Sequence, residues 1–572
     1  MSVHPWEHSY TEPARWDAPL EFSQVTKILD EAVAKFADRP AISFMGMRAT
    51  YGQFHALVAR AAAGFQKLGV RPGVHVGLYL PNTPHYPIAF FGILAAGGTI
   101  VNYSPLDAID VLAHKVRDSE TQILVTLEVP QLAPQTEAMS KIAPLRTIVL
   151  ANSTTDLAAF PLFANVGNAA AATPEATRID FADLLANDGS YVKHPFGDPA
   201  EEIAVVQYTG GTTGLPKGAL LTHANLTAAT NQYYETTKVT PPLLLEGTER
   251  TILVLPLFHI YALTSVMLLS IKYGSEMSLH PRFDAAAIVD DLVKNKTSIF
   301  YGVPTMYTAL VNYPGFGELD FSALKYCASG GAPLPVEVIG TFRKLTGVSI
   351  SEGWGMTETS PSGTFTPARG ARKDGSCGIP VPHCDIRIVA VGDPTKTMPI
   401  GERGEIAIKG PNVMKGYWKN DAATADSFTA DGYFRTGDVA FMDADGFVFI
   451  VDRIKDMLLC GGFNVYPRNI EEAIYTHPGV TEVCVIGIKD EYRGETPKAF
   501  VVLKAGAPEF TLDELKEFLK DKLGKHEMVA QLEFRETLPK TAVGKLQKTV
   551  LVAEEAAKAD AVTTGATRTA RS

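Results

Sequence analysis

Apolar strands and amphipathic helices alternate through the first third of the chain, and this alternation limits the fold more than any other feature of the sequence. Strands are predicted at residues 41–44, 74–80, 99–102 and 123–126, and helices at residues 51–68, 84–96 and 108–118. Such alternation is typical of parallel sheets that are covered by helices on both faces. We therefore expect an α/β fold with a large N-terminal domain of parallel or mixed sheets layered with helices.

The composition favours a protein that acts on small molecules. Of the 572 residues, 46% are apolar and 20% are charged, and the formal net charge is −11. An acidic chain without a dense run of Lys or Arg is a poor partner for nucleic acid. The five cysteines form no Cys-x-x-Cys pair, and residues 1–24 contain no apolar signal sequence. These features predict a cytoplasmic protein that binds no nucleic acid.

One segment has the composition of a membrane span. Residues 252–271 include no Asp, Glu, Lys or Arg, and the segment is long enough for a helix that crosses a bilayer. Pro256 and His259 interrupt it, however, and a proline would break such a helix. We favour a buried strand at 252–257 followed by a core helix from about Tyr261, and therefore expect no transmembrane segment.

A loop rich in glycine and threonine follows the apolar run 203–206. Between Tyr208 and Gly218 it supplies backbone N–H groups, hydroxyl groups and a lysine, all of which bind phosphate. A P-loop is excluded because Gly218, and not Ser or Thr, follows the lysine. The alternative is a flexible surface loop without a ligand. The candidate phosphate-binding residues are Thr209, Gly210, Gly211, Thr212, Thr213, Gly214 and Lys217.

Two later segments combine small residues with an aromatic ring and carboxylates. Glycines let the backbone approach a flat ring, and the tryptophan offers a face for stacking on a base. The two segments are therefore candidates for binding adenine and a metal ion. Taken alone, they also fit a tight turn with a half-buried tryptophan. The candidate residues are Gly330, Gly331 and Ala332 in segment 329–333, and Glu352, Gly353, Trp354, Thr357 and Glu358 in segment 352–358.

Three charged motifs lie nearer the C-terminus. Asp438, in segment 433–438, has the acceptor pair that two ribose hydroxyls require, although an aspartate after glycine is also common in turns. Arg453 and Lys455 belong to segment 452–456, which is also compatible with a solvated turn. Lys545 ends segment 538–545, and a lysine at such a position is ordinarily a surface charge.

Taken together, these motifs resemble those of the adenylate-forming superfamily, which includes acyl-CoA synthetases, luciferases and the adenylation domains of peptide synthetases. The resemblance covers about residues 25–550 and contains the expected motifs in the expected order. Segments 255–263, 410–418 and 462–467 are most similar to bacterial fatty acid–CoA ligases. Trp354 is a departure, because many members carry a tyrosine there.

The resemblance implies a role for each motif. The glycine-rich loop would surround pyrophosphate, segments 329–333 and 352–358 would bind adenine, and Glu358 would hold Mg²⁺. Asp438 would bind the ribose, with Arg453 close to the nucleotide. Lys545 would stabilise the charge that develops during adenylation, and Thr357 and Glu358 would take part in the same step. His259 would lie near the acyl carboxylate, although a hydrogen-bonded core histidine fits its position equally well. The passage for coenzyme A would be lined by Gly461 and Gly462.

The resemblance also implies two domains. Residues 1–454 would form the AMP-binding domain, and residues 455–552 a small, mobile α+β domain with Lys455 as the hinge. In the small domain we expect strands at 483–488 and 499–503 and helices at 467–475 and 512–523. Residues 553–572 are rich in Ala and Thr and are expected to form a disordered tail.

The implied reaction has two steps. A fatty carboxylate and ATP, with Mg²⁺, would form acyl-AMP and pyrophosphate, and the thiol of coenzyme A would then displace AMP after the small domain has rotated. Two alternatives stay open, namely a ligase for dicarboxylic or aromatic acids and an acyl-AMP ligase that loads a separate carrier protein. The sequence does not determine the acyl chain length, the oligomeric state or whether the protein makes peripheral contact with a membrane.

Overall fold

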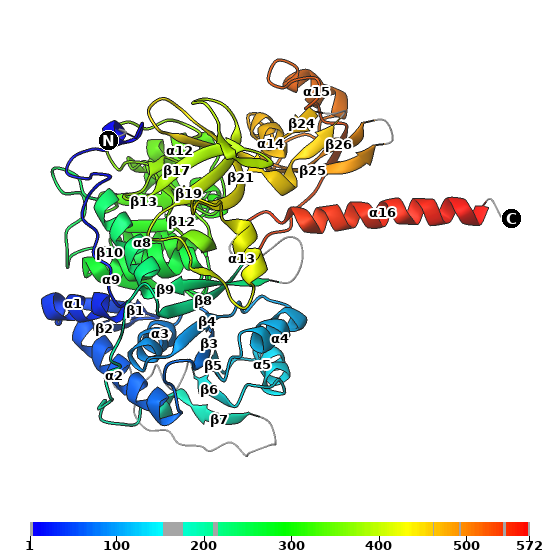
Figure 1. The fold of residues 1–572 in the computed structure, drawn as a ribbon. Helices are drawn as coiled ribbons and strands as arrows, with labels where there is room; N and C mark the ends of the chain where they lie inside the picture. The colour runs from blue at the N-terminus through cyan, green and yellow to red at the C-terminus, as the bar shows by residue number, and fades with distance from the viewer. Residues whose placement is uncertain are drawn as a thin grey trace.

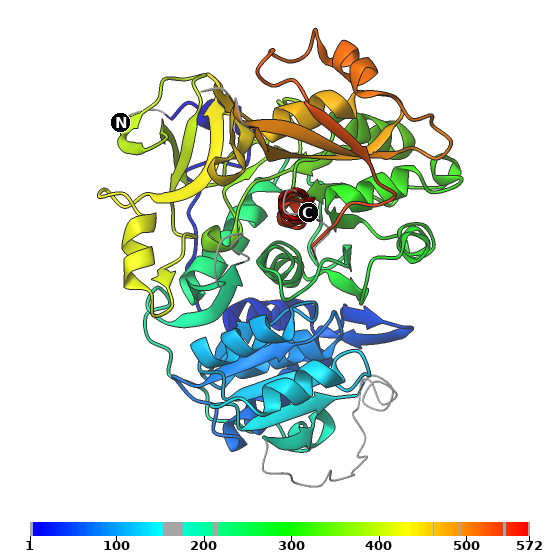
Figure 2. The same cartoon turned by 90° about the vertical axis from the view of Figure 1, so that its right-hand side faces the viewer.

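The computed structural model describes residues 4–152, 176–209, 216–460, 463–490, 493–541 and 545–569. A large lobe contains two mainly parallel sheets and a smaller antiparallel sheet, and a small lobe contains a sheet and helices of its own (Figures 1 and 2). The predicted α/β fold with a smaller α+β unit is therefore confirmed. Among the described residues, no helix has both the length and the apolar character that a membrane crossing requires.

The first sheet of the large lobe contains three of the four strands of the predicted alternation, namely those expected at 74–80, 99–102 and 123–126. Its inner strands pair in parallel, and antiparallel strands complete the edge that carries the glycine-rich loop. Figure 1 shows α2 and α3 on one face and α4 and α5 on the other. The strand order is β20 (Gly416–Tyr417), β9 (Lys217–Thr222), β8 (Ile203–Thr209), β4 (Thr99–Asn102), β3 (His75–Tyr79), β5 (Ile123–Leu127), β6 (Thr147–Ala151) and β7 (Thr177–Asp180).

The second sheet of the large lobe forms the floor of the candidate site. Its strands pair in parallel except for an edge hairpin. Helical segments connect β10 to β11 and each later strand to the next, as crossover connections between parallel strands require. The strand order is β14 (Ile350–Glu352), β13 (Tyr326–Ser329), β12 (Ile299–Gly302), β10 (Arg250–Leu253), β11 (Glu276–Leu279), β1 (Pro40–Phe44) and β2 (Met47–Thr50).

The third sheet is antiparallel and connects the large lobe to the small one. Its strands are β18 (Asp393–Thr397), β17 (Asp385–Ala390), β19 (Gly404–Lys409), β21 (Phe434–Met442) and β22 (Val448–Arg453), and the short strands β15 (Thr364–Phe365) and β16 (Ile379–Pro380) pair separately. The small lobe contains β23 (Leu458–Cys460), β24 (Phe463–Val465), β25 (Val480–Asp490), β26 (Gly494–Leu503), β27 (Gln531–Phe534), α14 (Pro467–Tyr475), α15 (Leu512–Leu519) and α16 (Lys548–Thr569).

Helices cover these sheets and connect their strands. The α-helices of the large lobe are α1 (Thr26–Phe36), α2 (Tyr51–Lys67), α3 (His85–Ala95), α4 (Ile109–Asp118), α5 (Ala133–Ser140), α7 (Phe181–Leu184), α8 (His223–Thr236), α9 (Leu269–Tyr273), α10 (Ala285–Val293), α11 (Pro304–Val311), α12 (Val336–Thr346) and α13 (Asp421–Ser427). The short 3₁₀ turns are η1 (Glu7–Ser9), η3 (Phe316–Glu318), η4 (Thr357–Thr359) and η5 (Ile454–Asp456), and η2 (Tyr261–Leu268) is a π-helix.

Four local expectations differ from the structure. The strand predicted at 41–44 joins the second sheet beside β11, because pairing partners are set by tertiary packing that the alternation does not encode. The helix expected from Tyr261 begins there as a π-helix. The helix predicted at 512–523 ends at Leu519. Leu523 still packs on the same core, so the helical spacing of apolar residues in the sequence extends beyond the helix itself. Finally, α16 occupies most of the predicted disordered tail, because alanine is a strong helix former.

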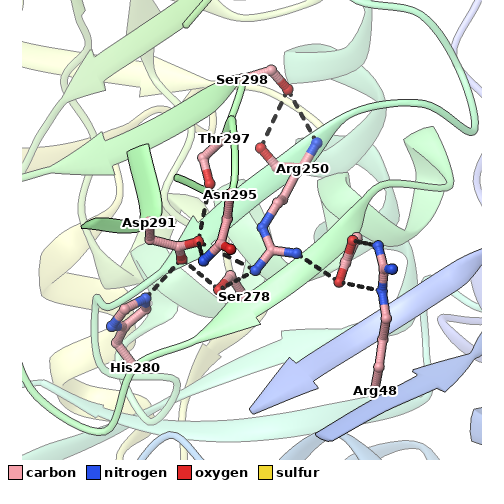
Figure 3. A network of polar contacts seen from close by, with 9 residues as sticks. Arg48, Arg250, Ser278, His280, Asp291, Asn295, Thr297 and Ser298 are labelled. Atoms are coloured by element: carbon pink, nitrogen blue, oxygen red, sulfur yellow. Dashed lines mark hydrogen bonds and ion pairs between the residues drawn. The ribbon is translucent and has the colours of Figure 1, made fainter. Parts of the chain in front are cut away.

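A buried polar network ties the second sheet together (Figure 3). Asp291, at the end of α10, accepts hydrogen bonds from His280 Nε2 at 2.9 Å and Asn295 Nδ2 at 2.8 Å, and its contact with Arg250 Nη2 is 3.2 Å. Arg250 Nη1 also lies 2.8 Å from Glu276 Oε1, and Arg48 of β2 binds the same carboxylate. Because buried charges are tolerated only when they are paired, this network fixes β2, β10, β11 and α10 relative to one another.

Candidate active site

A cavity of about 1920 Å³ lies where the two lobes meet. Its walls come from β8, the segments after β12, β13 and β14, the third sheet and the small lobe. Most of the predicted site residues within the described ranges line it, and Lys217 is the exception. The predicted residues in its wall are Thr209, His259, Gly330, Gly331, Ala332, Glu352, Gly353, Trp354, Thr357, Glu358, Asp438, Arg453, Lys455 and Lys545.

The phosphate-binding candidate is the turn of a β-hairpin. Thr209, at the end of β8, pairs with Lys217, at the start of β9, and the exposed Lys217 Nζ lies 5.0 Å from the centre of the Tyr417 ring. The hairpin therefore brings both ends of the loop to the edge of the cavity. Its central residues Gly210, Gly211, Thr212, Thr213 and Gly214, and likewise Gly461 and Gly462, lie outside the described residues.

Trp354, Asp438 and Arg453 form a connected group in the cavity wall. The indole Nε1–H of Trp354 donates to Asp438 Oδ2 at 2.7 Å, and Arg453 Nε lies 3.1 Å from Asp438 Oδ1. Asp438 is only 4% exposed, and these two donors fix the direction of its carboxylate. A side chain on Gly363 would come within 2.5 Å of the indole, which shows that the backbone packs closely against the ring.

Glu358 is a buried carboxylate in the cavity wall, and the Tyr417 side chain is its hydrogen-bond partner. The hydroxyl of Tyr417 donates to Glu358 Oε1 at 2.9 Å, and burial raises the pKa of Glu358 above its usual range. Glu352 lies on the same wall, where burial raises its pKa to about 7 while a weak hydrogen bond from the Leu334 N–H, at 3.4 Å, opposes the shift. No other described side chain donates to the Glu358 carboxylate, so its second oxygen can bind a cation or accept a hydrogen bond from a ligand.

Lys545 reaches from the small lobe into the cavity. Gly331 has φ +83°, and a Cβ added there would lie 2.9 Å from Lys545 Cε, so the lysine side chain passes directly over this glycine. Burial, together with the positive charge of Arg453, lowers the pKa of Lys545 to about 8, and Asp438 opposes that shift. The two lobes thus contribute cationic and anionic groups to one site.

His259 is a neutral imidazole in this arrangement. Burial, with the nearby Lys545, lowers its pKa to about 3. The Tyr261 N–H donates to His259 Nδ1 at 3.2 Å, so the ring carries its proton on Nε2. At neutral pH His259 can therefore donate a hydrogen bond but does not supply a charge.

The segment around Lys455 connects the lobes through a contact between Asp452 and α14. Asp452 Oδ2 accepts a hydrogen bond from the Arg468 N–H at 3.0 Å, in the first turn of α14, and Tyr466 gives that helix no side-chain cap. The carboxylate of the large lobe therefore caps a helix of the small lobe. Burial lowers the pKa of Lys455, with Arg453 as the next cause.

Two residues of this site had no assigned role in the sequence. Tyr417 lies in segment 410–418, but nothing in the local sequence connects it to a glutamate 59 residues earlier. Asp452 was one charge among several in segment 452–456. The absence of a Ser, Thr, Asp or Asn directly before Pro467 is the signal that would have suggested a cap from elsewhere.

Comparisons with known proteins agree with this geometry. The family model of AMP-binding enzymes matches residues 29–418, and that of the AMP-binding enzyme C-terminal domain matches residues 469–545. A long-chain-fatty-acid–CoA ligase of Bacillus subtilis is 39% identical over 97% of this chain and 99% of its own. ATP-bound MatB from Rhodopseudomonas palustris is 27% identical with a TM-score of 0.80, covering 92% of this chain and 98% of that one. An anthranilate CoA ligase in complex with anthranoyl-AMP is 26% identical with a TM-score of 0.81, covering 94% and 98%.

Proposed function

Because this chain belongs to the AMP-binding enzymes, we propose that it is an ATP-dependent ligase that joins a fatty acid to coenzyme A through an acyl-adenylate. The observation that carries the proposal is the position of Lys545, which the small lobe inserts over Gly331 of the large lobe, in a cavity that Asp438 and Trp354 also line. A cation from one lobe thus meets a nucleotide-sized site in the other. We also propose that the enzyme works in the cytoplasm, where ATP and coenzyme A are available.

In the first step an oxygen of the fatty carboxylate attacks the α-phosphorus of ATP, and pyrophosphate leaves. We assign the ribose to Asp438, whose carboxylate Trp354 and Arg453 already orient. Lys545 neutralises charge at the α-phosphate, and the neutral His259 donates from Nε2 to the attacking carboxylate. The hairpin between Thr209 and Lys217 surrounds the leaving pyrophosphate.

Mg²⁺ fits the site if Glu358 is its protein ligand. This ion is commonly held by one or two carboxylates together with substrate phosphates, and not by a cage of protein ligands. Within the described ranges, no cluster of three or more His, Cys, Asp or Glu side chains is arranged to hold a metal, so a single buried carboxylate agrees with that mode. When bound, the ion would neutralise phosphate charge.

In the second step the thiol sulfur of coenzyme A attacks the acyl carbonyl carbon, the thiol proton is lost, and AMP leaves. We propose that the small lobe turns about Lys455 between the steps, which withdraws Lys545 and opens a path for the thiol. The segment that contains Gly461 and Gly462 is our candidate for lining that path. The Asp452 contact with α14 then belongs to the adenylating arrangement.

Product analysis tests this function directly. The purified chain is incubated with ATP, Mg²⁺ and a set of carboxylic acids, with and without coenzyme A. We expect AMP and pyrophosphate only when an acid is present, and thioester only when coenzyme A is added. Formation of ADP would refute the adenylation chemistry. Acyl-AMP that transfers to a carrier protein but never to coenzyme A would identify an acyl-AMP ligase instead.

A further inference from the structure

One end of the cavity is lined mainly by tyrosines. We call the surface formed by Tyr233, Tyr261, Ser265, Leu269, Tyr301 and Tyr326 the tyrosine end. Its residues come from α8, η2, α9, β12 and β13. The rings of Tyr261 and Tyr301 meet edge to face at 6.5 Å between centroids, and those of Tyr301 and Tyr326 do so at 5.9 Å. The aromatic rings therefore form a continuous wall.

The tyrosine end begins next to the reacting groups. A Cβ added to Gly330 would lie 3.0 Å from Tyr261 Cζ, while Lys545 passes over the adjacent Gly331. An acid whose carboxylate lies at Lys545 can therefore extend its tail past Tyr261 toward Tyr301 and Tyr326. The tyrosine end is thus the part of the cavity where the acyl tail fits.

Two hydroxyl groups in this wall are available to form hydrogen bonds with a ligand. The hydroxyls of Tyr261 and Tyr301 form no hydrogen bond with any described residue, although Tyr301 is only 6% exposed. Burial raises the pKa of both tyrosines well above the usual value, so their hydroxyls remain neutral donors.

Two kinds of tail match this wall poorly. An unsubstituted alkyl tail would displace water from the hydroxyls and leave them without hydrogen bonds, which is unfavourable in a buried site. A tail that ends in a carboxylate would place a charge against the tyrosine end, where none of the six residues is Lys, Arg or His. A tail with an uncharged oxygen satisfies the hydroxyls without that cost.

We propose that the tyrosine end selects acids whose tail carries an uncharged hydrogen-bonding oxygen, such as a hydroxyl group, over acids with an unsubstituted or a carboxylated tail. This inference rests on the proposed ligase function, because it concerns the acid that the same site activates. Sites that hydrogen-bond a substrate hydroxyl discriminate strongly against the analogue that lacks it. We therefore expect a preference of at least about tenfold in kcat/KM.

Matched acids provide the test. One set contains phenylpropanoic acid, its para-hydroxy derivative and its para-carboxy derivative, and a second contains octanoic acid, its terminal hydroxy derivative and the dicarboxylic acid of the same length. Acid-dependent AMP release in the presence of coenzyme A gives kcat/KM for each. The inference predicts that the hydroxy acid is best in at least one set. It is overturned if the unsubstituted or the carboxylated acid equals or exceeds the hydroxy acid in both sets.

Two variants connect the preference to the wall. Tyr301→Phe removes one oxygen and keeps the ring, so it should reduce the hydroxy-to-plain ratio of kcat/KM at least about threefold. Tyr307→Phe is the matched control, because the Tyr307 hydroxyl donates to the Ala328 carbonyl oxygen at 2.8 Å and its side chain is fully buried outside the cavity wall. The ratio cancels any loss of folded enzyme.

The outcomes separate this inference from the function on which it rests. A ratio that Tyr301→Phe and Tyr307→Phe change equally, or that neither changes, would overturn the role of the tyrosine end while leaving the ligase function intact. If no acid in these sets or in the product analysis above supports AMP release, the proposed function itself fails, and the inference fails with it. If only acids outside both sets do so, the inference alone is overturned.

Discussion

Each lobe is stabilised by a core of its own, and these cores differ from the contact that joins the two lobes. In the large lobe, a continuous apolar core extends through two sheets, and the buried network around Asp291 and Arg250 cross-links one of them. The small lobe has a compact core of its own, built on β25, β26, α14 and α15. Each lobe is therefore stabilised mainly by contacts within itself.

The contact between the lobes is smaller and partly polar. Asp452 caps α14, Arg403 lies 5.4 Å from the centre of the Tyr466 ring, and Tyr466 packs on Val439 and Val451. These contacts involve one hydrogen bond, one cation–π interaction and a few apolar side chains, and such groups can separate at low cost. The difference indicates that the large lobe fixes the geometry of the site, whereas the small lobe is attached so that it can turn.

The first prediction is that Lys545 of the small lobe serves adenylation and not the thioester step. Lys545→Ala should reduce acyl-AMP formation by at least about 10²–10³-fold, since a donor to the developing charge is lost, but leave the conversion of supplied acyl-AMP to acyl-CoA nearly unchanged. The two half-reactions are measured separately. Lys520→Ala is the control, because Lys520 pairs with Glu517 on the surface of the small lobe, outside the cavity wall. Equal loss of both half-reactions in Lys545→Ala would contradict the assignment.

The second prediction concerns the rigidity of the large lobe. Asp291→Ala leaves Arg250 without one of its carboxylate partners, and we expect the free energy of unfolding to fall by about 3–5 kcal/mol. Urea denaturation followed by tryptophan fluorescence measures the loss. Asp290→Ala is the matched control, because Asp290 pairs with Lys294 at an exposed site and should cost less than about 1 kcal/mol. Similar losses for both variants would show that the network does not stabilise the lobe.

The third prediction tests whether rotation at Lys455 divides the cycle. Lys455 lies in the 3₁₀ turn η5, where φ is already close to the value that proline imposes. Lys455→Pro should therefore favour the present arrangement, with Lys545 in the cavity, and slow thioester formation at least about tenfold more than adenylation. Both half-reactions slowed by one factor, with unchanged stability, would mean that the rotation is not required.

The fourth prediction is a pH dependence that comes from the small lobe. Burial lowers the pKa of Lys545 to about 8, so its charge in the free enzyme is lost as the pH rises through that value. We expect kcat/KM for ATP in adenylation to fall about tenfold for each pH unit above it. Lys545→Arg, which stays charged, should lower activity but remove this decline. A decline that persists in Lys545→Arg would assign it to another group.

The smallest predicted effect arises at the contact between the lobes. Asp452→Ala removes the cap of α14, an interaction worth about 0.5–2 kcal/mol, and should slow adenylation several-fold while the thioester step is unchanged or faster. Asp452→Asn retains an acceptor and should restore most of the rate. Asp431→Ala is the control, since Asp431 pairs with Arg387 at the surface. If adenylation is unchanged in Asp452→Ala, the cap does not favour the adenylating arrangement of the lobes.

The sequence predicted elements and motifs better than it predicted contacts. Helix α14 has the expected bounds of 467–475 because Pro467 and the apolar period are local signals. The bond between Trp354 and Asp438 joins residues 84 positions apart, and only the folded chain brings the indole donor to that carboxylate. The tyrosine end is likewise assembled from α8, η2, α9, β12 and β13. Contacts between residues on elements far apart in the sequence leave no periodic pattern from which they could be predicted.

Helix α16 projects from the small lobe and can report its rotation. Its base is anchored to the small lobe by Lys498, which lies 2.8 Å from Glu555, and by the buried Leu551, and Figure 1 shows the rest extending away from the body. Its 22 residues correspond to a rod of about 33 Å at 1.5 Å per residue. Each degree by which the small lobe turns about the base of this rod would move its tip by about 0.6 Å. A dye attached near the C-terminal end of α16, paired with one on the large lobe, would convert the rotation between half-reactions into a fluorescence signal in real time.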